Sequence, residues 1–379
     1  MRYRTAFPYF DDDDIENILI EFKKILQGDG MLTMGSNVDF LEKSFSSMVG
    51  ARYSIATNSC TSALETVLTA IGVSSEDEVI VPAQTFIATG SSVARSGGIP
   101  IFAEINKNFL MDKEDLYSKL NHKTKAVILV HFAGLIDQDI FEIRDHLKQK
   151  GIFLIEDAAH APGASINDIK AGNIGDFGCF SFFSTKNITT GEGGMITTNN
   201  EKLANLCGSI RNRGLDLGSD KELFKFLGSN FRMTEIQAIL GRYQLRKLDS
   251  FNKHRNSIAE IYKSKLQILG EEALIEIPKI PDNIFHTYWR FWIKLRDFKK
   301  RDELKNQLKE VGIDIDWAYT PLLHLQPVFK DLYGTRLGML PKSEEMAETH
   351  ICLPIHMKIS EEGAIFISDM LIEKLRQLS

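Results

Sequence analysis

The 379-residue sequence has few cysteines, no long apolar run and no excess of basic residues, and each shortage excludes a class of protein. A net charge of −6 leaves no basic surface for a nucleic acid or an anionic membrane. Apolar strings such as Ala126–Val130 are far too short to cross a bilayer, and the acidic run at residues 11–14 stands where a signal peptide needs an apolar core. The scattered cysteines form no Cys-x-x-Cys pair, which argues for reduced thiols and against a structural zinc site; they are Cys60, Cys179, Cys207 and Cys352. We therefore expect a cytoplasmic protein with no metal.

Two nucleotide-binding motifs are also absent. No Gly-x-x-x-x-Gly-Lys-Ser/Thr occurs, and no Gly-x-Gly-x-x-Gly follows a predicted strand, so neither a P-loop nor a Rossmann fingerprint is indicated. The glycine-rich stretch at residues 191–194 precedes the predicted strand Met195–Thr198 rather than a helix. We interpret it as a turn.

Short apolar runs alternate with helical patterns through the first half of the chain. The helical stretches include Ile87–Arg95 and Ile140–Lys150. The predicted strands are Tyr53–Thr57, Glu78–Pro82, Ile99–Ile105, Lys125–Phe132 and Gly151–Asp157. Continuous apolar runs between helices are typical of a parallel sheet buried on both faces, so the pattern predicts a layered α/β domain.

The pattern changes after about residue 230. The elements expected there are helices at Met233–Leu248, Asn252–Leu269, Arg301–Val311 and near Ser360–Arg376, with an aromatic-rich segment at Tyr288–Leu295. We interpret residues 1–254 as a large domain and residues 255–379 as a smaller α+β domain.

Two residues of complementary chemistry stand at predicted strand ends. Asp157 closes one strand, and Lys186 lies in a turn that follows the apolar run Phe180–Phe183. A buried lysine near an acid can have a lowered pKa and form a Schiff base with a carbonyl. An aspartate at a strand end can keep a pyridine ring protonated, and a pyridoxal 5'-phosphate (PLP) enzyme needs both groups from its protein. Each residue alone is more often structural.

Weaker signals surround this pair. The turn at residues 57–65 places hydroxyl residues at a helix N-terminus, which suits either an anion or an ordinary N-cap by Ser59 or Thr61. His160 either contacts a cofactor ring or caps a loop, and the Ser181 hydroxyl either donates to a phosphate or satisfies the backbone. Because ligands bind beyond the carboxyl ends of strands in open parallel sheets, we expect these residues to lie close together.

Taken in order, these segments resemble the DegT/StrS-type sugar aminotransferases, a branch of the type I PLP fold. The resemblance runs through nearly the whole chain. The segments that carry it are MGSNVDFLEKSF, TNSCTSALE, DEVIVPAQTFIATG, LIEDAAHAPGA, GDFGCFSFFSTKNITTGEGGMITT, GSNFRMTEIQAILG and TPLLHLQP. The family's fold implies a large domain with a mixed, mostly parallel sheet flanked by helices, and a smaller α+β C-terminal domain.

The resemblance implies roles around the cofactor ring. Lys186 would be the Schiff-base lysine and Asp157 the partner of the pyridine nitrogen. Phe86 matches the aromatic residue that stacks on the ring, and His160 matches the residue near its 3-hydroxyl.

The resemblance also implies a phosphate site, where Cys60, Thr61 and Ser181 lie. Asn230 matches an asparagine that reaches the phosphate of the neighbouring subunit, which requires a homodimer with shared active sites. The chain departs from the family's pattern twice. Cys60 stands where the family commonly has glycine, and Arg213 stands where it often has histidine. The arginine adds a fixed positive fork suited to phosphate or carboxylate.

The activity implied is a PLP-dependent aminotransferase that takes its amino group from an amino acid, L-glutamate by family analogy. Its acceptor would be a keto group on a nucleotide-linked sugar, in surface-polysaccharide or related sugar biosynthesis. Arg213, Tyr319 and His324 are the expected substrate contacts, although Tyr319 is equally suited to the core or to an interface. Alternatives are a small phosphorylated ketone such as dihydroxyacetone phosphate, and a non-catalytic regulator that binds a small molecule. A third is a sugar dehydratase, in which histidine replaces the lysine, so Lys186 argues against it.

Overall fold

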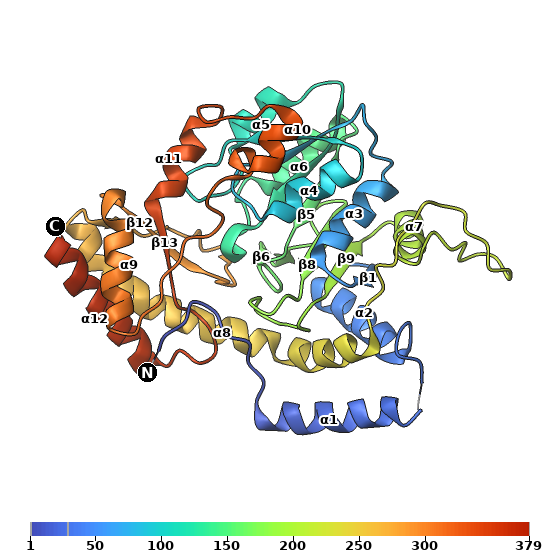
Figure 1. Cartoon of the computed structure of the whole chain (residues 1–379), viewed down its shortest axis with the longest axis horizontal. Coiled ribbons are helices and arrows are strands. Elements are labelled where there is room, and N and C mark those ends of the chain that lie inside the picture. Colours follow the sequence, from blue (N-terminus) through green and yellow to red (C-terminus); the bar gives the residue numbers. More distant parts are fainter. Residues whose placement is uncertain (1, 29, 379) are drawn as a thin grey trace.

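Seven strands form a central sheet in the order β1-β9-β8-β5-β4-β2-β3 in the computed structural model, which describes residues 2–28 and 30–378 (Figure 1). The strands are β1 (Tyr53–Thr57), β2 (Glu78–Pro82), β3 (Ile99–Ala103), β4 (Thr124–Val130), β5 (Phe153–Asp157), β8 (Phe177–Ser181) and β9 (Gly194–Thr198). β9 runs antiparallel to β1 and β8, and the other neighbouring pairs are parallel. The expected mixed, mostly parallel α/β sheet is confirmed.

Helices cover both faces of this sheet, because alternate residues of a strand point to opposite sides. In β2, Val79 and Val81 belong to one apolar core and Ile80 to the other. Val79 and Val81 share their core with α3 (Cys60–Ala70), α4 (Ile87–Arg95) and α7 (Glu201–Arg211). The opposite core includes residues of α2 (Ser36–Val49), α5 (Lys113–Lys119) and α6 (Ile140–Gln149).

One continuous helix, α8 (Glu235–Glu271), runs from the central sheet to the C-terminal part of the chain (Figure 1). The prediction of two helices with a break near residue 250 is wrong. Leu248 and Phe251 are both buried, at the spacing of one helical face. The polar pair Asp249–Ser250 therefore lies on the exposed side of an unbroken helix.

A smaller antiparallel sheet, β10-β12-β13, has its own apolar core with the second half of α8. Its elements are β10 (Ile275–Glu276), β12 (Phe291–Leu295), β13 (His350–Leu353), α9 (Arg301–Glu310) and α12 (Glu361–Leu378). The domain boundary at residues 254/255 falls inside α8, so its position stays a prediction. The remaining elements are a three-stranded sheet of β6 (Ser165–Ile166), β7 (Ile169–Lys170) and β11 (Ile284–Phe285), helices α10 (Pro327–Tyr333) and α11 (Pro341–Thr349), and short 3-10 turns at Phe132–Gly134, Phe298–Lys300 and Leu323–Leu325.

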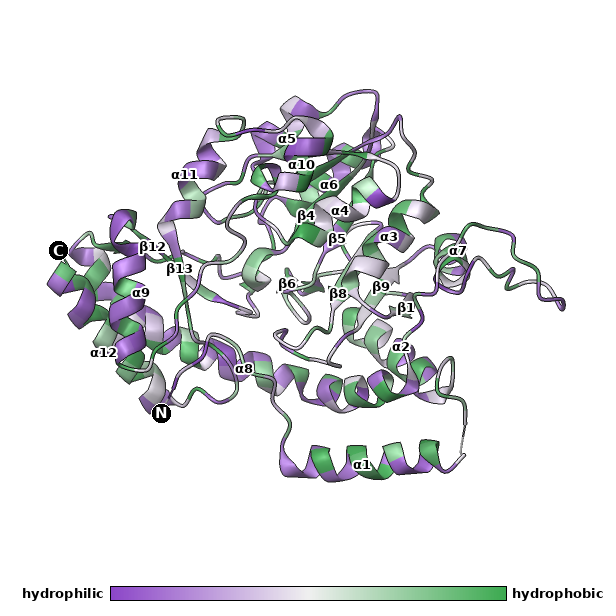
Figure 2. Cartoon of the chain, in the orientation of Figure 1, coloured by the Kyte–Doolittle hydropathy of each residue, from purple (hydrophilic) through white to green (hydrophobic). Residues whose placement is uncertain are grey.

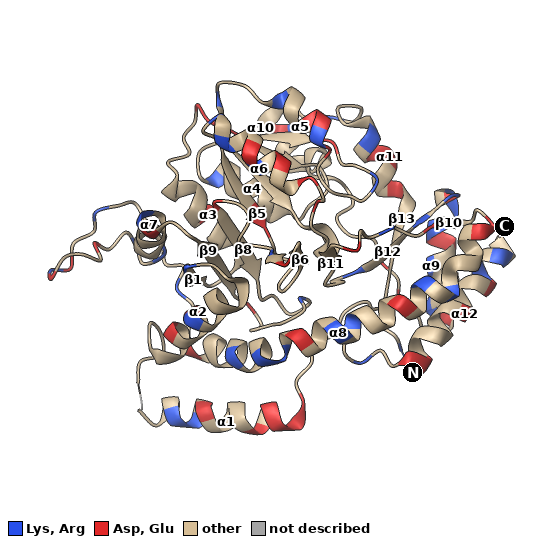
Figure 3. Ribbon diagram, turned by 180° about the vertical axis from the view of Figure 1, so that it is seen from behind, with Lys and Arg blue, Asp and Glu red and all other residues tan. Residues whose placement is uncertain are grey.

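Helix α1 (Asp12–Leu26) packs on α8 through Ile18 and Ile25, which form an apolar cluster with Tyr243. Acidic residues occupy its first turn and lysines its last, which complements the helix dipole (Figure 3). Hydrophobic and hydrophilic residues alternate along it (Figure 2), and some apolar ones, such as Leu19, stay exposed. Among the residues that the structure describes, no helix is long and apolar enough to cross a membrane.

Candidate active site

A cavity of about 460 Å³ lies beyond the carboxyl ends of β4, β5 and β8, where a parallel sheet is expected to bind its ligand. The predicted site residues that line it are Cys60, Thr61, Phe86, Asp157, His160, Ser181, Lys186 and Tyr319. A larger hollow of about 630 Å³, near Leu135–Asp139, is lined by none of them. The smaller cavity is therefore the candidate active site.

Lys186 stands in a tight turn, where its N–H donates to the carbonyl of Phe183. The side chain is half-buried, and its Nζ lies 4.4 Å from the centroid of the Trp289 ring. Burial lowers the pKa of Lys186 to about 8, against the opposing attraction of Asp157. A lysine with this pKa has a substantial neutral fraction near physiological pH, which a nucleophilic amine requires.

Asp157 is the last residue of β5, and 5% of its surface is exposed. Its carboxylate accepts hydrogen bonds from the Thr89 hydroxyl at 2.8 Å and from the N–H of Ala159 at 3.2 Å. Burial raises the pKa of Asp157, while these two donors and Lys186 oppose the rise. A cationic N–H placed in this cavity would therefore meet a buried, oriented carboxylate.

The N-terminus of α3 also lines the cavity. Ser59 caps the helix by accepting from the N–H of Ser62. The N–H groups of Cys60 and Thr61 make no hydrogen bond within the described residues, and both residues line the cavity with Ser181. Free N–H groups at a helix N-terminus suit a phosphate.

Cys60 is the first residue of α3, so a side chain at this position is compatible with the backbone that the helix needs. Burial raises the pKa of its thiol well above the ordinary value, which keeps it neutral beside an anion. The neighbouring position 194, in contrast, must be a glycine, since a Cβ there would lie 2.4 Å from the carbonyl carbon of Ser59. Cys60, at a position where the family commonly has glycine, is therefore compatible with the observed turn.

His160 forms an aromatic stack at one wall. Its ring is 3.8 Å from that of Trp289 and nearly parallel to it, and the Tyr319 ring lies 5.8 Å away at 12°. His160 Nδ1 accepts from the N–H of Ala133, so Nε2 carries the proton and donates to the Tyr319 hydroxyl at 2.7 Å. Burial lowers the pKa of His160 well below its ordinary value, and Lys186 adds to this. Phe86 stands at the rim, 6.0 Å from the Tyr319 ring, and 55% of its surface is exposed.

Arg213 and Asn230 lie on the arm, by which we mean residues 212–232, the loop that follows α7 and extends away from the rest of the chain (Figure 1). Arg213 has a positive φ of 64° and lies over the ring of Phe224. Neither Arg213 nor Asn230 lines the cavity of its own chain. Their roles stay predictions, and the role implied for Asn230 would need a second copy of the chain.

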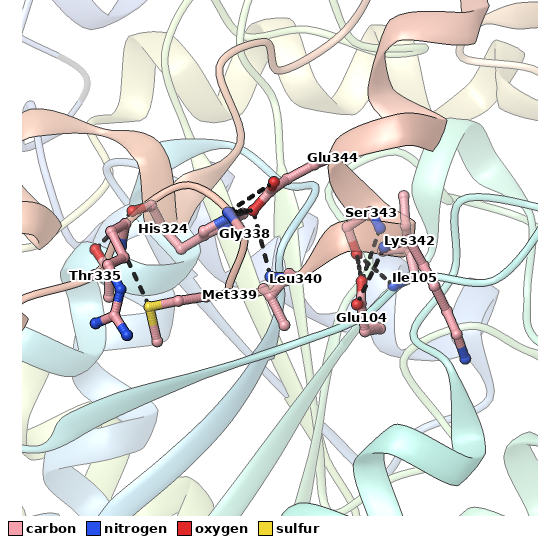
Figure 4. Close-up of polar contacts among 11 residues, drawn as sticks. Glu104, Ile105, His324, Thr335, Gly338, Met339, Leu340, Lys342, Ser343 and Glu344 are labelled. Carbon is pink, nitrogen blue, oxygen red and sulfur yellow. Dashed lines mark hydrogen bonds and ion pairs between the residues drawn. The ribbon is translucent and has the colours of Figure 1, made fainter.

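His324 is fully buried outside the cavity. Its Nε2 lies 2.9 Å from the carboxylate of Glu344 on α11, which also accepts the N–H groups of Gly338 and Leu340 (Figure 4). Its ring also lies near that of Phe102. The structure therefore does not bring His324 to the cavity with the other predicted site residues, and its substrate role stays a prediction.

The cavity also has residues that sequence reasoning missed. Trp289, Arg290 and Asp316 line one wall, and Thr89 supports Asp157 from α4. The one available signal was an arginine beside a tryptophan inside the aromatic-rich segment Tyr288–Leu295.

The donor set fits PLP. One cavity holds a lysine amine with a lowered pKa, a buried carboxylate for a ring nitrogen, and free N–H groups with hydroxyls for a phosphate. When bound, PLP would supply an electron-withdrawing ring. Lys186 would hold it covalently, Asp157 would pair with its nitrogen, and Cys60, Thr61 and Ser181 would hold its phosphate.

Comparisons with known proteins identify the family of the chain. The profile of the DegT/DnrJ/EryC1/StrS aminotransferase family matches residues 12–371. GDP-perosamine synthase of Escherichia coli O157:H7 is 33% identical over 340 residues, which cover 89% of this chain and 90% of that protein. Pleiotropic regulatory protein of Geobacillus stearothermophilus is 36% identical over 350 residues, 91% of each chain. The solved PLP form of Spr1654 from Streptococcus pneumoniae matches with a TM-score of 0.91 and 26% identity over 100% of both chains. The chain therefore belongs to the DegT/DnrJ/EryC1/StrS aminotransferase family and is a PLP-dependent aminotransferase.

Proposed function

We propose that this aminotransferase moves an amino group from L-glutamate to a keto group of a nucleotide-linked sugar, in the cytoplasm, during synthesis of a surface polysaccharide or related sugar. The cavity that joins Lys186, Asp157 and the N-terminus of α3 carries the chemistry of the proposal. The similarity to a GDP-perosamine synthase over 89% of the chain supports the class of acceptor.

Lys186, Asp157 and His160 have separate roles in the proposed reaction. Lys186 takes the proton from the donor's α-carbon and later returns a proton to the acceptor carbon, for which a pKa of about 8 is well matched to neutral pH. Asp157 holds a proton on the ring nitrogen of the cofactor. The neutral His160 keeps Tyr319 oriented by donating to its oxygen, which leaves the hydroxyl proton of Tyr319 free to donate into the cavity.

The acceptor is tested by separating the two half-reactions. The PLP-loaded protein is first treated with L-glutamate and freed of donor, and each candidate ketone is then added while the cofactor's absorbance is followed. Return of the original absorbance with a GDP- or UDP-linked ketosugar supports the proposal. Return with dihydroxyacetone phosphate alone would replace the acceptor by the small-ketone alternative. A wild-type spectrum that no amino acid changes would contradict transamination and favour a regulator that only binds a ligand.

We propose a homodimer with shared active sites as the assembly. Exposed apolar residues on α1 and on the arm support it, since exposed apolar surface often marks interaction sites. They are Ile15, Leu19, Ile20, Leu26, Leu217, Leu223, Phe224, Phe226 and Leu227. Asn230 lies at the base of the arm, where it pairs with Asn212, and it does not line the cavity of its own chain.

Mixed dimers test the sharing of sites. Lys186→Ala removes the amine from one chain, and Asn230→Asp places a negative charge where the partner's phosphate is expected. Each variant alone should be inactive or strongly impaired. Because a mixed dimer has one site with both wild-type residues, mixing should restore up to a quarter of wild-type activity if subunits pair at random. No recovery from two folded, exchanging dimers would contradict shared sites.

A further inference from the structure

Arg290 is a buried cation that faces the active-site cavity with poor partners. Only 7% of its surface is exposed, and it lines the cavity together with Lys186. Its Nη1 donates to the carbonyls of Thr5 and Trp289 at 3.3 and 3.5 Å, both long for a hydrogen bond. Its Nε has no acceptor within the described residues. A guanidinium has five N–H donors, and burying them unpaired is costly.

The nearest carboxylate does not satisfy the unpaired N–H donors of Arg290. Asp316 lies 3.5 Å from Nη2, too far for a short charge-assisted bond, and its other oxygen is buried without a partner in the described part of the chain. Arg255, an equally buried arginine, provides a contrast. Its Nη1 donates to the carbonyls of Tyr288 and Ile355 at 3.0 and 2.5 Å. The Nε of Arg255 is also without an acceptor in the described residues, but its Nη1 makes short bonds and it does not line the cavity, whereas Arg290 has only long bonds and lines the cavity wall.

The position of Arg290 relative to Lys186 indicates which anion it would receive. Both cations contact the Trp289 ring, with Lys186 Nζ 4.4 Å and Arg290 Cζ 4.2 Å from its centroid, so they lie close to each other. In an amino acid, a single carbon separates the amine from the carboxylate. An amino acid whose nitrogen is near Lys186 therefore has its carboxylate within reach of Arg290. The cofactor phosphate would lie elsewhere, at the N-terminus of α3, and a planar carboxylate matches the guanidinium fork.

We propose that Arg290 binds the α-carboxylate of the amino donor, and that Asp316 pairs with the Arg290 guanidinium while no donor is bound and is displaced by the donor's carboxylate. The inference rests on the proposed transamination and adds the subsite that selects α-amino acids. On binding, the carboxylate oxygens take the donors that are unpaired, and Asp316 turns toward solvent, to which its side chain is already 35% exposed.

The test uses the PLP-loaded protein and 2-methyl-L-glutamate, which lacks the α-proton, so its binding is measured from the cofactor spectrum without turnover. Arg290→Met should raise its dissociation constant roughly 10- to 100-fold, the usual range for loss of a charge-assisted pair. Arg290→Lys should recover part of the loss. Asp316→Asn should bind at least as tightly as wild type, because the competing charge is gone. Arg296→Met, which removes an exposed arginine just beyond β12, is the matched control and should not change binding.

A second measurement needs no variant. The wild type should bind 2-methyl-L-glutamate far more tightly than 4-aminobutyrate, which keeps the amine and the distal carboxylate but lacks the α-carboxylate. In Arg290→Met that preference should nearly vanish. Equal preference in wild type and Arg290→Met, or an effect confined to the second half-reaction with the ketosugar, would overturn the assignment. A wild type that changes its spectrum with no amino acid would instead defeat the proposed transamination.

Discussion

The lowered pKa of Lys186 predicts that this residue destabilises the protein when PLP is removed. The folded-state pKa is about 8, and the ordinary value is 10.5. Above pH 10.5 the lysine is neutral in both the folded and the unfolded chain, so it does not lower the free energy of unfolding. As pH falls toward 8 the unfolded chain gains a proton that the folded chain resists, and below 8 the full penalty is present. Because each pH unit between the two pKa values corresponds to about 1.4 kcal/mol, the penalty is on the order of 3 kcal/mol.

The perturbation is Lys186→Met, which keeps the stem of the side chain and removes the charge. Cofactor-free Lys186→Met should be more stable than the cofactor-free wild type at pH 7. Its advantage should shrink by about 1.4 kcal/mol per pH unit above pH 8. Urea unfolding from pH 7 to 9.5 measures the difference, and Lys186→Arg, which keeps a cation in the cavity, should show no such pH-dependent gain. An advantage that is constant across this range would refute the buried-lysine argument, even if the variant were more stable.

Two further predictions concern single contacts. Thr89→Val should weaken PLP binding by about 1–3 kcal/mol, or roughly 5- to 150-fold, because it removes the buried hydroxyl that donates to Asp157. Titration of the apoprotein with PLP measures the affinity, and Thr89→Ser is the control that keeps the hydrogen bond; equal affinity in all three proteins would contradict the role of Thr89. His324→Gln should lower the free energy of unfolding by about 1–3 kcal/mol through its buried contact with Glu344, while the dissociation constant for 2-methyl-L-glutamate stays unchanged; a selective loss of substrate binding would support the predicted substrate role.

The core of the site could be predicted because it depends on local pattern and one topological rule. The apolar runs that form the parallel strands are buried on both faces, so they read as continuous stretches. The carboxyl ends of parallel strands share one edge, which brings Asp157, Ser181 and the turn with Lys186 together without any knowledge of long-range packing. The family resemblance then gave these residues their roles.

The sequence was less informative where a short segment does not reveal its tertiary partner. The motif around His324 could not show that Glu344 lies against it, since the two elements meet only in the folded chain. The polar pair after Leu248 looked like a break because it interrupts the apolar pattern, yet tertiary packing on both sides keeps α8 continuous. Arg290 was missed because it directly precedes β12, a strand of the smaller sheet, and only long-range folding places it at the cavity.

The turn with Lys186 and the segment that carries Arg290 are hydrogen-bonded to each other, and this affects which amino donors the site would accept. The residues on either side of Lys186 both bond to the same short segment. The carbonyl of Thr185 accepts from the Trp289 indole at 2.9 Å, and the Asn187 amide donates to the carbonyl of Thr287 at 2.9 Å.

The same amide also donates to Asn252 on α8, the helix that joins the two sheets. Because Arg290 directly follows Trp289, these bonds hold the backbone of the lysine turn close to the backbone that carries the unpaired guanidinium. A site with its two ends fixed in this way recognises a ligand by the spacing of its charged groups. An amine and a carboxylate on one carbon meet that spacing, so donor selection would depend on the fold itself, whereas selection of the acceptor is left to the rim and to residues of the arm.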